Sequence, residues 1–329
     1  MLIETNVHEH GGVFMNKKAG AVLAIDIGGS KLVTGVVDAD GSIYGESRAV
    51  LSYPLTKEDL RKLISELCHK TLAQYGKDDV LCAGATIPGL ADPEKGLWVY
   101  ASFSGIGDFP IAEQLETDLG IPVYIENDVN ACALGEIYFG SCKEVSDFLW
   151  ITVSNGVGGS VVINGHVHSG AYGNAGEFGH VNVKEDGYLC QCGNRGCTEA
   201  QAAGPAILRR YLDRSGSADE SLSAKQLALL AREGDLLAQE IFTETGYFLA
   251  KAIAPAVNVL NPQKVIIGGG VALSFDLFYP ELKKTLDRMV FQAANQNLVI
   301  EQTALGYAAA LYGAAAVGFQ GINEKLNGV

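Results

Sequence analysis

Apolar runs broken by glycine turns occur twice along the chain in the same order. Residues 21–38, AVLAIDIGGSKLVTGVVD, place a Gly-Gly turn between two apolar runs. Residues 148–163, FLWITVSNGVGGSVVI, repeat this arrangement about a domain's length later. Short apolar runs bounded by turn residues are typical of strands, so each stretch predicts a strand, a turn and a second strand. The repetition predicts a duplicated fold in which the two glycine turns face a shared cleft.

Helical and extended patterns alternate through the rest of the chain. Thr56 precedes apolar residues at helical spacing and, with Asp59 three residues on, predicts a helix start. A turn at Asp40-Gly41 predicts a third strand that runs through Val50. Further strands are predicted over 80–88, 123–127 and 264–270, and helices over 110–119, 129–139 and within 204–260. This order predicts an α/β protein with helices packed on mixed β-sheets.

Composition narrows the class of protein. The 329 residues are 48% hydrophobic, which is enough apolar side chain for about two packed domains. The formal net charge of -14 argues against nucleic-acid binding, because affinity for phosphate backbones rests on Lys and Arg. Residues 306–319 form the longest apolar stretch, too short for the roughly 20 residues of a membrane span, so no membrane association is expected. Residues 1–20 are a polar extension without the apolar core of a signal peptide, and the seven cysteines favour a reducing cytoplasm.

Three glycine turns are candidates for binding phosphate. The first consists of Asp26, Gly28, Gly29, Ser30 and Lys31, the second of Ser154, Asn155 and Gly156, and the third of Gly268 and Gly269. Backbone N–H groups without side chains can meet phosphate oxygens, and Asp26 can hold hydrated Mg²⁺ beside them. The first two turns could clamp a polyphosphate, and the third could pass beneath an adenine ring. The alternative is a plain hairpin turn with Asp26 as a capping acceptor. No turn has the Walker A or dinucleotide-binding spacing.

The segment Glu126-Asn127-Asp128 lies between a short apolar strand and a helix. A carboxylate held at that junction can accept a proton from a substrate hydroxyl while the hydroxyl attacks a γ-phosphorus. Asp128 is therefore the candidate general base. The alternative is that Asp128 only caps the following helix, which is a common role for Asp.

Cysteines at close spacing predict a metal site. Cys190, Cys192 and Cys197 follow His180, and three thiolates with one imidazole satisfy tetrahedral Zn²⁺. Four protein ligands leave no open position, so the zinc would be structural; free thiols are the alternative. Glu177 and Glu199 flank the cluster. A bound zinc would fix the segments that carry these two carboxylates, and with His180 they would then be suited to binding sugar hydroxyls. Their alternative role is solvated surface charge.

These motifs together resemble the ROK family of sugar kinases and repressors. The resemblance rests on DIGGSK at 26–31, IPG at 87–89, ENDVNA at 126–131, GAYGNAGEFGH at 170–180, CQCGNRGCTE at 190–199 and IIGGG at 266–270. It implies a two-lobed, actin-like (ribonuclease H-like) ATPase fold with duplicated mixed β-sheet domains, Mg-ATP as phosphoryl donor, and a homodimer or larger assembly. By matching positions it implies Asp128 as catalytic base, Asn127, Glu177, His180 and Glu199 as sugar contacts, and His180, Cys190, Cys192 and Cys197 as zinc ligands.

Two positions depart from the family's pattern. Where kinases of the family commonly carry an Asn that bonds sugar hydroxyls, this chain has Phe103, with Ser102 or Ser104 as substitutes for that contact if the alignment shifts by one residue. A substrate hydroxyl left without a partner is costly, so we expect the preference to lie away from plain glucose. Asn155 stands where the phosphate turn usually has Thr and keeps a hydrogen-bond donor.

The sequence therefore predicts an ATP-dependent kinase of a hexose or hexose derivative. The alternative is a non-catalytic sugar-sensing relative of the family's repressors, without their DNA-binding domain, because only 20 residues precede Ala21. A structural role that follows from an actin-like fold alone would leave Asp128 and the cysteines unexplained. We expect a small lobe of residues 21–126 and 303–325, and a large lobe of residues 127–302 that contains a zinc loop at 180–199.

Overall fold

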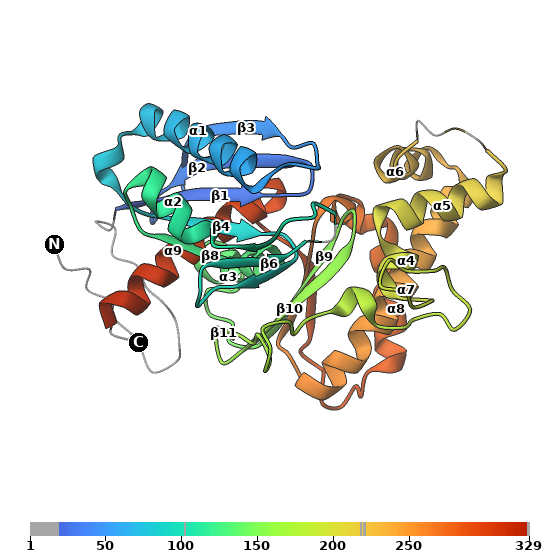
Figure 1. Cartoon of the computed structure of the whole chain (residues 1–329). Coiled ribbons are helices and arrows are strands. Elements are labelled where there is room, and N and C mark those ends of the chain that lie inside the picture. The colour runs from blue at the N-terminus through green and yellow to red at the C-terminus, as the bar shows by residue number, and fades with distance from the viewer. Residues whose placement is uncertain (1–19, 102, 218, 220–221, 328–329) are drawn as a thin grey trace. The chain divides into compact units, whose positions relative to one another are not determined.

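The two predicted strand–turn–strand stretches each open one β-sheet of the protein. The computed structural model describes residues 20–101, 103–217, 219 and 222–327, and these form two units (Figure 1). The first unit takes the described residues up to Val145, then Ser169–Asn174 and the described residues from Tyr307. The second unit takes Ser146–His168 and the described residues of Ala175–Gly306.

The first sheet has the order β3-β2-β1-β4-β8. Its strands are β1 (Ala21–Ile27), β2 (Lys31–Val37), β3 (Ile43–Val50), β4 (Val80–Ile87) and β8 (Val123–Asn127). The strands β3, β2 and β1 pair antiparallel, whereas β1, β4 and β8 pair parallel. The carboxyl ends of the three parallel strands therefore meet at one edge of the sheet, the edge where α/β folds bind ligands.

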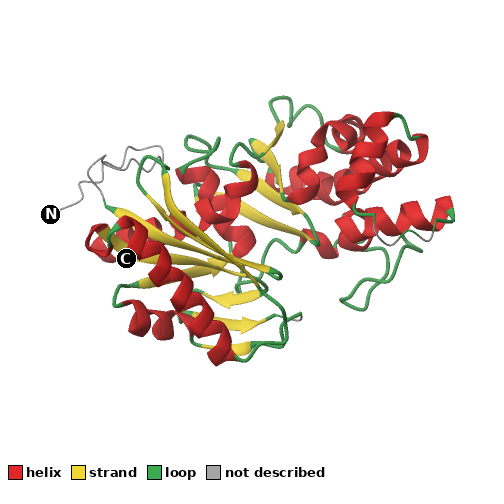
Figure 2. Ribbon diagram, turned by 90° about the horizontal axis from the view of Figure 1, so that it is seen from above, coloured by secondary structure: helices red, strands yellow, loops and turns green. Residues whose placement is uncertain are grey.

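Successive apolar side chains of β1 point to opposite faces of this sheet, which explains why helices cover both faces. Leu23 and Ile25 point to one core, with α1 (Lys57–Tyr75) and α2 (Ile111–Leu119), whereas Val22 and Ala24 point to a second core with α9 (Ala309–Asn327). Figure 2 shows helices on both sides of these strands. The predicted start of α1 is confirmed, because the Thr56 side chain accepts a hydrogen bond from the Asp59 amide.

The C-terminal helix α9 lies unusually close to its neighbours. A methyl group placed on Gly84 of β4 would lie 2.0 Å from the backbone oxygen of Ala314, and one on Gly313 would lie 2.6 Å from the backbone of Ala131. Ala131 belongs to α3 (Asp128–Tyr138). The glycines thus permit backbone-to-backbone contact, which holds α9 against β1 and β4 and holds α3 against α9.

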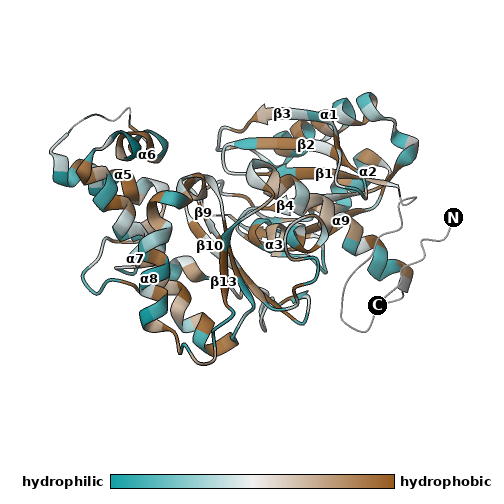
Figure 3. Ribbon diagram, turned by 180° about the vertical axis from the view of Figure 1, so that it is seen from behind, coloured by the Kyte–Doolittle hydropathy of each residue, from teal (hydrophilic) through white to brown (hydrophobic). Residues whose placement is uncertain are grey.

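The second sheet repeats the topology of the first. Its order β11-β10-β9-β12-β13 also joins two antiparallel pairs to two parallel pairs, which confirms the predicted duplication. Its strands are β9 (Phe148–Val153), β10 (Val157–Ile163), β11 (His166–Val167), β12 (Lys264–Gly268) and β13 (Val299–Gln302). Apolar residues of β9 and β12 share a core with helices of this unit, and Figure 3 shows hydrophobic colour on the neighbouring strands β9 and β10.

The helices of the second unit come from the long helical section of the sequence and the residues around it. They are α4 (Thr198–Ala202), α5 (Gly204–Ser215), α6 (Ala224–Glu233), α7 (Leu236–Leu260) and α8 (Phe275–Met289). The mixed α/β fold with two sheets is thus as the sequence predicts. None of the helices in the described part of the chain is both long enough and apolar enough to span a membrane.

The predicted boundary after residue 126 differs from the observed division. Residues 127–145 group with the first unit, because α3 packs against α9 there, and Ser169–Asn174 also group with it. The small sheet formed by β5 (Leu90–Asp92), β6 (Leu97–Tyr100) and β7 (Gly107–Phe109) has no counterpart among the predicted elements. Residues 1–19 of the predicted extension lie outside the described residues.

Candidate functional site

Asp26 ends the buried strand β1 and carries the acidic group of the first glycine turn. Its carboxylate is 6% exposed, accepts a hydrogen bond from the Thr86 hydroxyl at 3.2 Å, and lies 3.7 Å from the Lys31 ammonium. Burial raises the pKa of Asp26, and Lys31 opposes that shift. Thr86 is not among the predicted site residues; the sequence signal for it is a polar residue inside an otherwise apolar strand. A buried carboxylate with a lysine beside it suits a site for a cation and phosphate.

The first glycine turn is tight, and Gly29 and Ser30 are exposed at its tip. The Gly28 amide donates to the Lys31 carbonyl at 2.9 Å, which places Gly29 and Ser30 at the tip. The Lys31 ammonium lies 5.8 Å from the ring centroid of Tyr307. The turn is therefore a hairpin, as the alternative interpretation has it, but one whose exposed backbone amides can still meet an anion.

Asn127 and Asp128 stand at the junction of β8 and α3. The Asn127 side-chain oxygen accepts hydrogen bonds from the amides of Val129 and Asn130, so Asn127 is the helix cap and Asp128 is the first helical residue. The Asn127 amide group also donates to the Gly89 carbonyl at 2.9 Å and to Asp128 Oδ1 at 3.1 Å. Asn127 rather than Asp128 is therefore the main cap of α3. Its side chain also holds the Asp128 carboxylate in place through a hydrogen bond.

The Asp128 carboxyl group is poised to exchange a proton near neutral pH. Burial, with a smaller contribution from the negative charge of Asp26, raises the pKa of Asp128 from 3.8 to about 7. Two carboxylates close to one strand edge disfavour each other's ionised form, which is a common way of tuning a general base. Asp26, Asn127, Asp128 and the glycine turn are thus brought together in the first unit.

The loop that holds the predicted hydroxyl contact lies between β6 and β7. Phe103 is 46% exposed, whereas the Ser104 hydroxyl is buried and donates to the Ala101 carbonyl at 3.2 Å while accepting from the Ile106 amide. Ser104 is therefore occupied in holding the loop. Ser102 lies outside the described residues. Of the three candidates, Phe103 is the described side chain that faces outward.

The second and third glycine turns lie side by side in the second unit. The Ser154 amide donates to the Gly156 carbonyl at 2.8 Å, and the Ser154 carbonyl accepts from the Gly204 amide at the start of α5. A methyl group on Gly270 would lie 3.5 Å from the Ser154 hydroxyl. Gly269 has a positive φ of 89° and makes the third turn, whereas Gly268 is buried against Trp150 and serves packing.

The zinc ligands predicted from the sequence come together in the second unit. The ligand atoms of His180, Cys190, Cys192 and Cys197 all lie within 4.8 Å of one another. His180 Nδ1 lies 3.7 Å from the Cys190 sulfur, and the sulfurs of Cys192 and Cys197 are 3.6 Å apart. A zinc ion about 2.3 Å from each sulfur at tetrahedral angles separates its ligands by about 3.5–3.8 Å. The Cys3His cluster therefore fits Zn²⁺ in spacing and in donor chemistry.

Glu177 and Glu199 both lie next to this Cys3His cluster; Glu177 precedes its ligands in the sequence and Glu199 follows them. Glu177 Oε2 lies 3.7 Å from His180 Nε2, the ring nitrogen that does not face the cysteines. Glu199 Oε2 accepts a hydrogen bond from the Val157 amide, and its other oxygen lies 3.9 Å from the Cys190 sulfur. Glu199 thus joins the second glycine turn to the cluster, a role that its position in the sequence did not indicate.

The zinc loop is also supported by helices. The Tyr188 hydroxyl donates to Asp213 of α5 at 2.6 Å, and the Arg209 guanidinium lies 3.6 Å from the Tyr188 ring centroid. Lys251 of α7 donates a hydrogen bond to the Val183 carbonyl. These contacts position the segment that leads from His180 into the cysteines, so the loop does not depend on metal alone.

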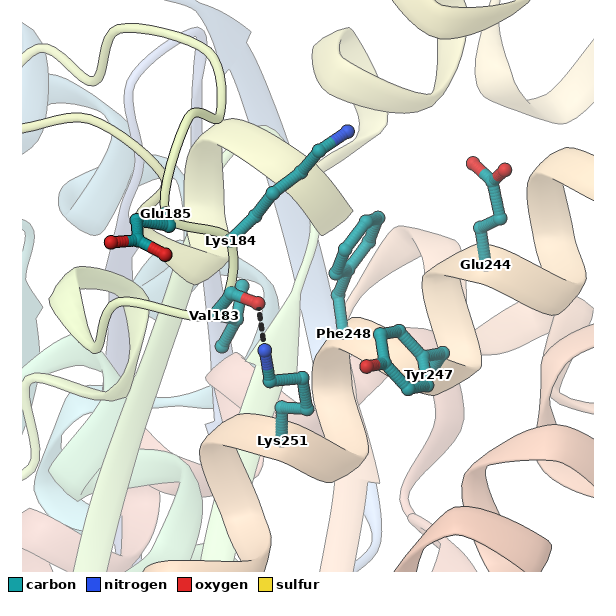
Figure 4. A pocket seen from close by; sticks show the side chains of 7 residues that line it. All are labelled: Val183, Lys184, Glu185, Glu244, Tyr247, Phe248 and Lys251. Atoms are coloured by element: carbon teal, nitrogen blue, oxygen red, sulfur yellow. Dashed lines mark hydrogen bonds between the residues drawn. The ribbon is translucent and has the colours of Figure 1, made fainter.

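A cavity of about 390 Å³ lies at the Lys251 contact (Figure 4). It is lined by Val183, Lys184, Glu185, Glu244, Tyr247, Phe248 and Lys251. The Lys184 and Lys251 ammonium groups lie 5.9 Å and 5.7 Å from the ring centroids of Phe248 and Tyr247. No residue predicted from the sequence as part of the site lines this cavity, so we interpret it as part of the support of the zinc loop.

Comparisons with known proteins match nearly the whole chain. A glucokinase of Streptomyces coelicolor is 30% identical over 312 residues, which are 90% of this chain and 96% of that protein. The DNA-binding transcriptional dual regulator NagC of Escherichia coli is 29% identical over 288 residues, covering 83% of this chain and 71% of that protein.

The fold also matches that of a solved structure. The crystal structure of a ROK family glucokinase from Streptomyces griseus, in complex with glucose and AMPPNP, has a TM-score of 0.78 at 29% identity and covers 92% of this chain and 100% of that chain. The family profile described as "ROK family" matches residues 22–320. With the two-sheet fold and the Cys3His cluster already in place, these matches show that the chain belongs to the ROK family.

Proposed function

We propose that this protein transfers the γ-phosphoryl group of ATP to a hydroxyl of a hexose or hexose derivative, with Asp128 as general base. The observation that carries the proposal is the Asp128 carboxyl group, fixed by Asn127 at the carboxyl edge of the first sheet with a pKa raised to about 7. At that pKa a carboxylate is a stronger base than an ordinary Asp, and about half of the molecules carry it ionised at pH 7.

In this proposal Asp128 accepts the proton of the sugar hydroxyl as its oxygen attacks phosphorus. The amides of Gly29 and Ser30 and the Lys31 ammonium bind phosphate oxygens in the first unit; Ser154, Asn155 and Gly156 do so in the second, and Gly269 borders the base. Asp26 would hold the Mg²⁺ that accompanies ATP. When bound, Mg-ATP supplies the phosphoryl group and spreads the charge that develops on it.

The sugar is held by hydrogen bonds from several side chains. We assign hydroxyl contacts to Asn127, Glu177, His180 and Glu199, and an apolar contact to Phe103; Ser102 stays the alternative candidate for the contact at that position. His180 offers Nε2 to the sugar because Nδ1 faces the cysteines, at 3.7 Å from the Cys190 sulfur. Zinc bound by the Cys3His cluster would fix that orientation of the ring. A metal-bound His commonly uses its other ring nitrogen for a hydrogen bond to an outer partner.

The test is a coupled assay of ADP formation over hexoses, 2-acetamido sugars, polyols and β-glucosides. We expect one sugar class to stimulate ATP consumption strongly in the wild-type protein. The Asp128→Asn variant should bind the same sugar and lose the stimulation. Sugar binding without ATP consumption by the wild type would contradict the proposal.

The match to NagC favours one second candidate, a sugar sensor without catalysis. Such a protein would bind a sugar tightly and would respond to it with a change of conformation or assembly, but Asp128→Asn would have no activity to remove. The two candidates therefore separate in the same assay. We further propose that the chain acts in the cytoplasm as a homodimer or a larger homo-oligomer. Light scattering of the purified protein tests the assembly.

A further inference from the structure

The loop between β6 and β7 presents one aromatic ring beside the first glycine turn. A methyl group placed on Gly29 would lie 3.8 Å from Phe103 Cε2, so the ring borders the tip of that turn. Phe103 is nearly half exposed, whereas Ala101, Ser104 and Ile106 of the same loop are buried. Phe103 is therefore the described large side chain of this loop that can contact a molecule bound next to the turn.

The backbone of the loop holds Phe103 in position. The Ala101 amide donates to the Ile106 carbonyl at 3.1 Å, and the Ala101 carbonyl accepts from the amides of Ser104 and Gly105. Gly105 has a φ of 69°, a conformation that other residues adopt with strain. A ring carried on so closed a loop is ordered before any ligand arrives, which lowers the entropic cost of binding.

Tyr53 supports the ring from behind. The two ring centroids are 5.2 Å apart at an interplanar angle of 77°, an edge-to-face pair. The Tyr53 hydroxyl is buried and has no hydrogen-bond partner among the described residues, and burial raises the pKa of Tyr53 to about 12. We call Tyr53 and Phe103 the aromatic wall; it is uncharged at every working pH.

The same loop also reaches the candidate base. Gly89, whose carbonyl accepts from the Asn127 side chain, packs so closely on the loop stem that a methyl group there would lie 2.4 Å from the Tyr100 carbonyl and 3.1 Å from Ala101 Cα. The loop therefore runs from the neighbourhood of Asp128 to the tip of the glycine turn. A sugar whose hydroxyl reaches Asp128 lies within range of the aromatic wall.

We propose, on the basis of the proposed function, that the aromatic wall selects a sugar that carries an apolar substituent where it faces Phe103. A hydroxyl directed at Phe103 would lose its hydrogen-bonding partner, whereas a methyl or methylene group gains contact with the ring. The acyl methyl of an acetamido sugar and the alkyl group of a glycoside share this chemistry.

The test compares matched sugars by calorimetry and by kinetics. The pairs are glucose with N-acetylglucosamine, mannose with N-acetylmannosamine, and glucose with methyl β-glucoside, each measured with a non-hydrolysable ATP analogue and then with ATP. We expect the wild type to prefer the substituted member of at least one pair by about 10- to 200-fold. The pair that shows the preference distinguishes an acetamido group from an alkyl glycoside.

Two variants separate the aromatic wall from general effects on folding. Phe103→Asn should reverse the preference, whereas Phe103→Leu, which keeps an apolar side chain at the same position, should keep its direction. Equal binding of both members of every pair, or an unchanged preference in Phe103→Asn, overturns the proposal. A preference in binding that Phe103→Asn reverses, without ADP formation, supports the wall and contradicts the kinase. No binding of any sugar contradicts both.

Discussion

The backbone amide of Val157 donates a hydrogen bond to Glu199 Oε2 at 3.1 Å, across 42 positions of the sequence. Glu199 lies at the start of α4, directly after the cysteine ligands, and Val157 follows the second glycine turn. The space between them is tight, because a methyl group on Gly156 would lie 2.5 Å from the same carboxylate oxygen. The carboxylate of Glu199, a candidate sugar contact, therefore also holds the backbone next to the second glycine turn, a candidate phosphate site.

This sharing predicts different effects for two substitutions of Glu199. Glu199→Gln keeps an oxygen for the Val157 amide, so the KM for ATP should stay near the wild-type value while sugar affinity falls about 10-fold through loss of the charged acceptor. Glu199→Ala removes both contacts, so both the sugar Kd and the ATP KM should rise. Calorimetry with sugar and initial-rate kinetics with ATP measure the two effects; equal ATP KM values in both variants would contradict the link.

Replacement of Asp128 should affect turnover more than binding. We expect Asp128→Asn to lower kcat by about 10²-fold or more, the range for loss of a positioned general base, with sugar and nucleotide Kd values within a few-fold of wild type. The wild-type kcat/KM should rise with pH up to a limb near 7, where Asp128 loses its proton. Turnover of the variant close to that of the wild type would exclude Asp128 from the mechanism.

The raised pKa of Asp128 also predicts how its replacement changes stability. Between its ordinary value of 3.8 and about 7 the folded protein keeps a proton that the unfolded chain has lost. The free energy of unfolding therefore falls as pH rises through this window, by at most about 4 kcal/mol. Asp128→Asn removes this term, so its unfolding midpoint should exceed the wild-type value at pH 8 and converge with it near pH 4. A midpoint below wild type at pH 8 would contradict the burial of the charge.

Zinc should be needed for the sugar site rather than for the fold. Elemental analysis of protein purified without added metal should find close to one zinc per chain, and Cys192→Ser should lose the metal and the sugar affinity. Because Tyr188 and Asp213 also hold the loop, the variant should keep its circular-dichroism spectrum. Cys68→Ala, whose thiol is buried away from the Cys3His cluster, is the matched control and should keep its zinc. Active protein without metal would refute the assignment.

The hydrogen bond from Lys251 to the Val183 carbonyl predicts a long-range effect on sugar binding. Lys251→Met keeps most of the side-chain volume but cannot donate, so the segment after His180 should loosen and the sugar Kd should rise several-fold with zinc retained. Lys184→Met, an exposed lysine of the same cavity, is the control and should change neither quantity. If both variants behave as wild type, the Lys251 contact does not position the zinc loop.

Local patterns predicted the scaffold well because its strands and helices are long. The runs around Gly28 and Gly156 became hairpins, Thr56 caps its helix, and the four metal ligands converge. These features depend on neighbouring residues or on donor chemistry that has few alternatives. The roles assigned to Asn127, Glu177, Glu199 and Phe103 stay predictions, since proximity in the structure does not by itself identify a bound sugar.

Contacts between distant segments were not visible in the sequence. Thr86 reaches Asp26 only because β1 and β4 pair in parallel with these residues in register. The small sheet of β5 to β7 has strands of three or four residues, too short for an alternating pattern to emerge. The division after Val145, rather than after residue 126, follows from the packing of α3 on α9, which unites segments from opposite ends of the chain.

The close packing of α9 on the first sheet has a consequence for synthesis on the ribosome. Val22, Ala24, Val33 and Cys82 are covered on one face by Leu311, Ala314 and Phe319, which are translated more than 200 positions later. The residues of the second unit that lie between them emerge before α9, so the first unit keeps this apolar face exposed until α9 leaves the exit tunnel. A nascent chain stalled before residue 307 would therefore expose the apolar face of the first sheet.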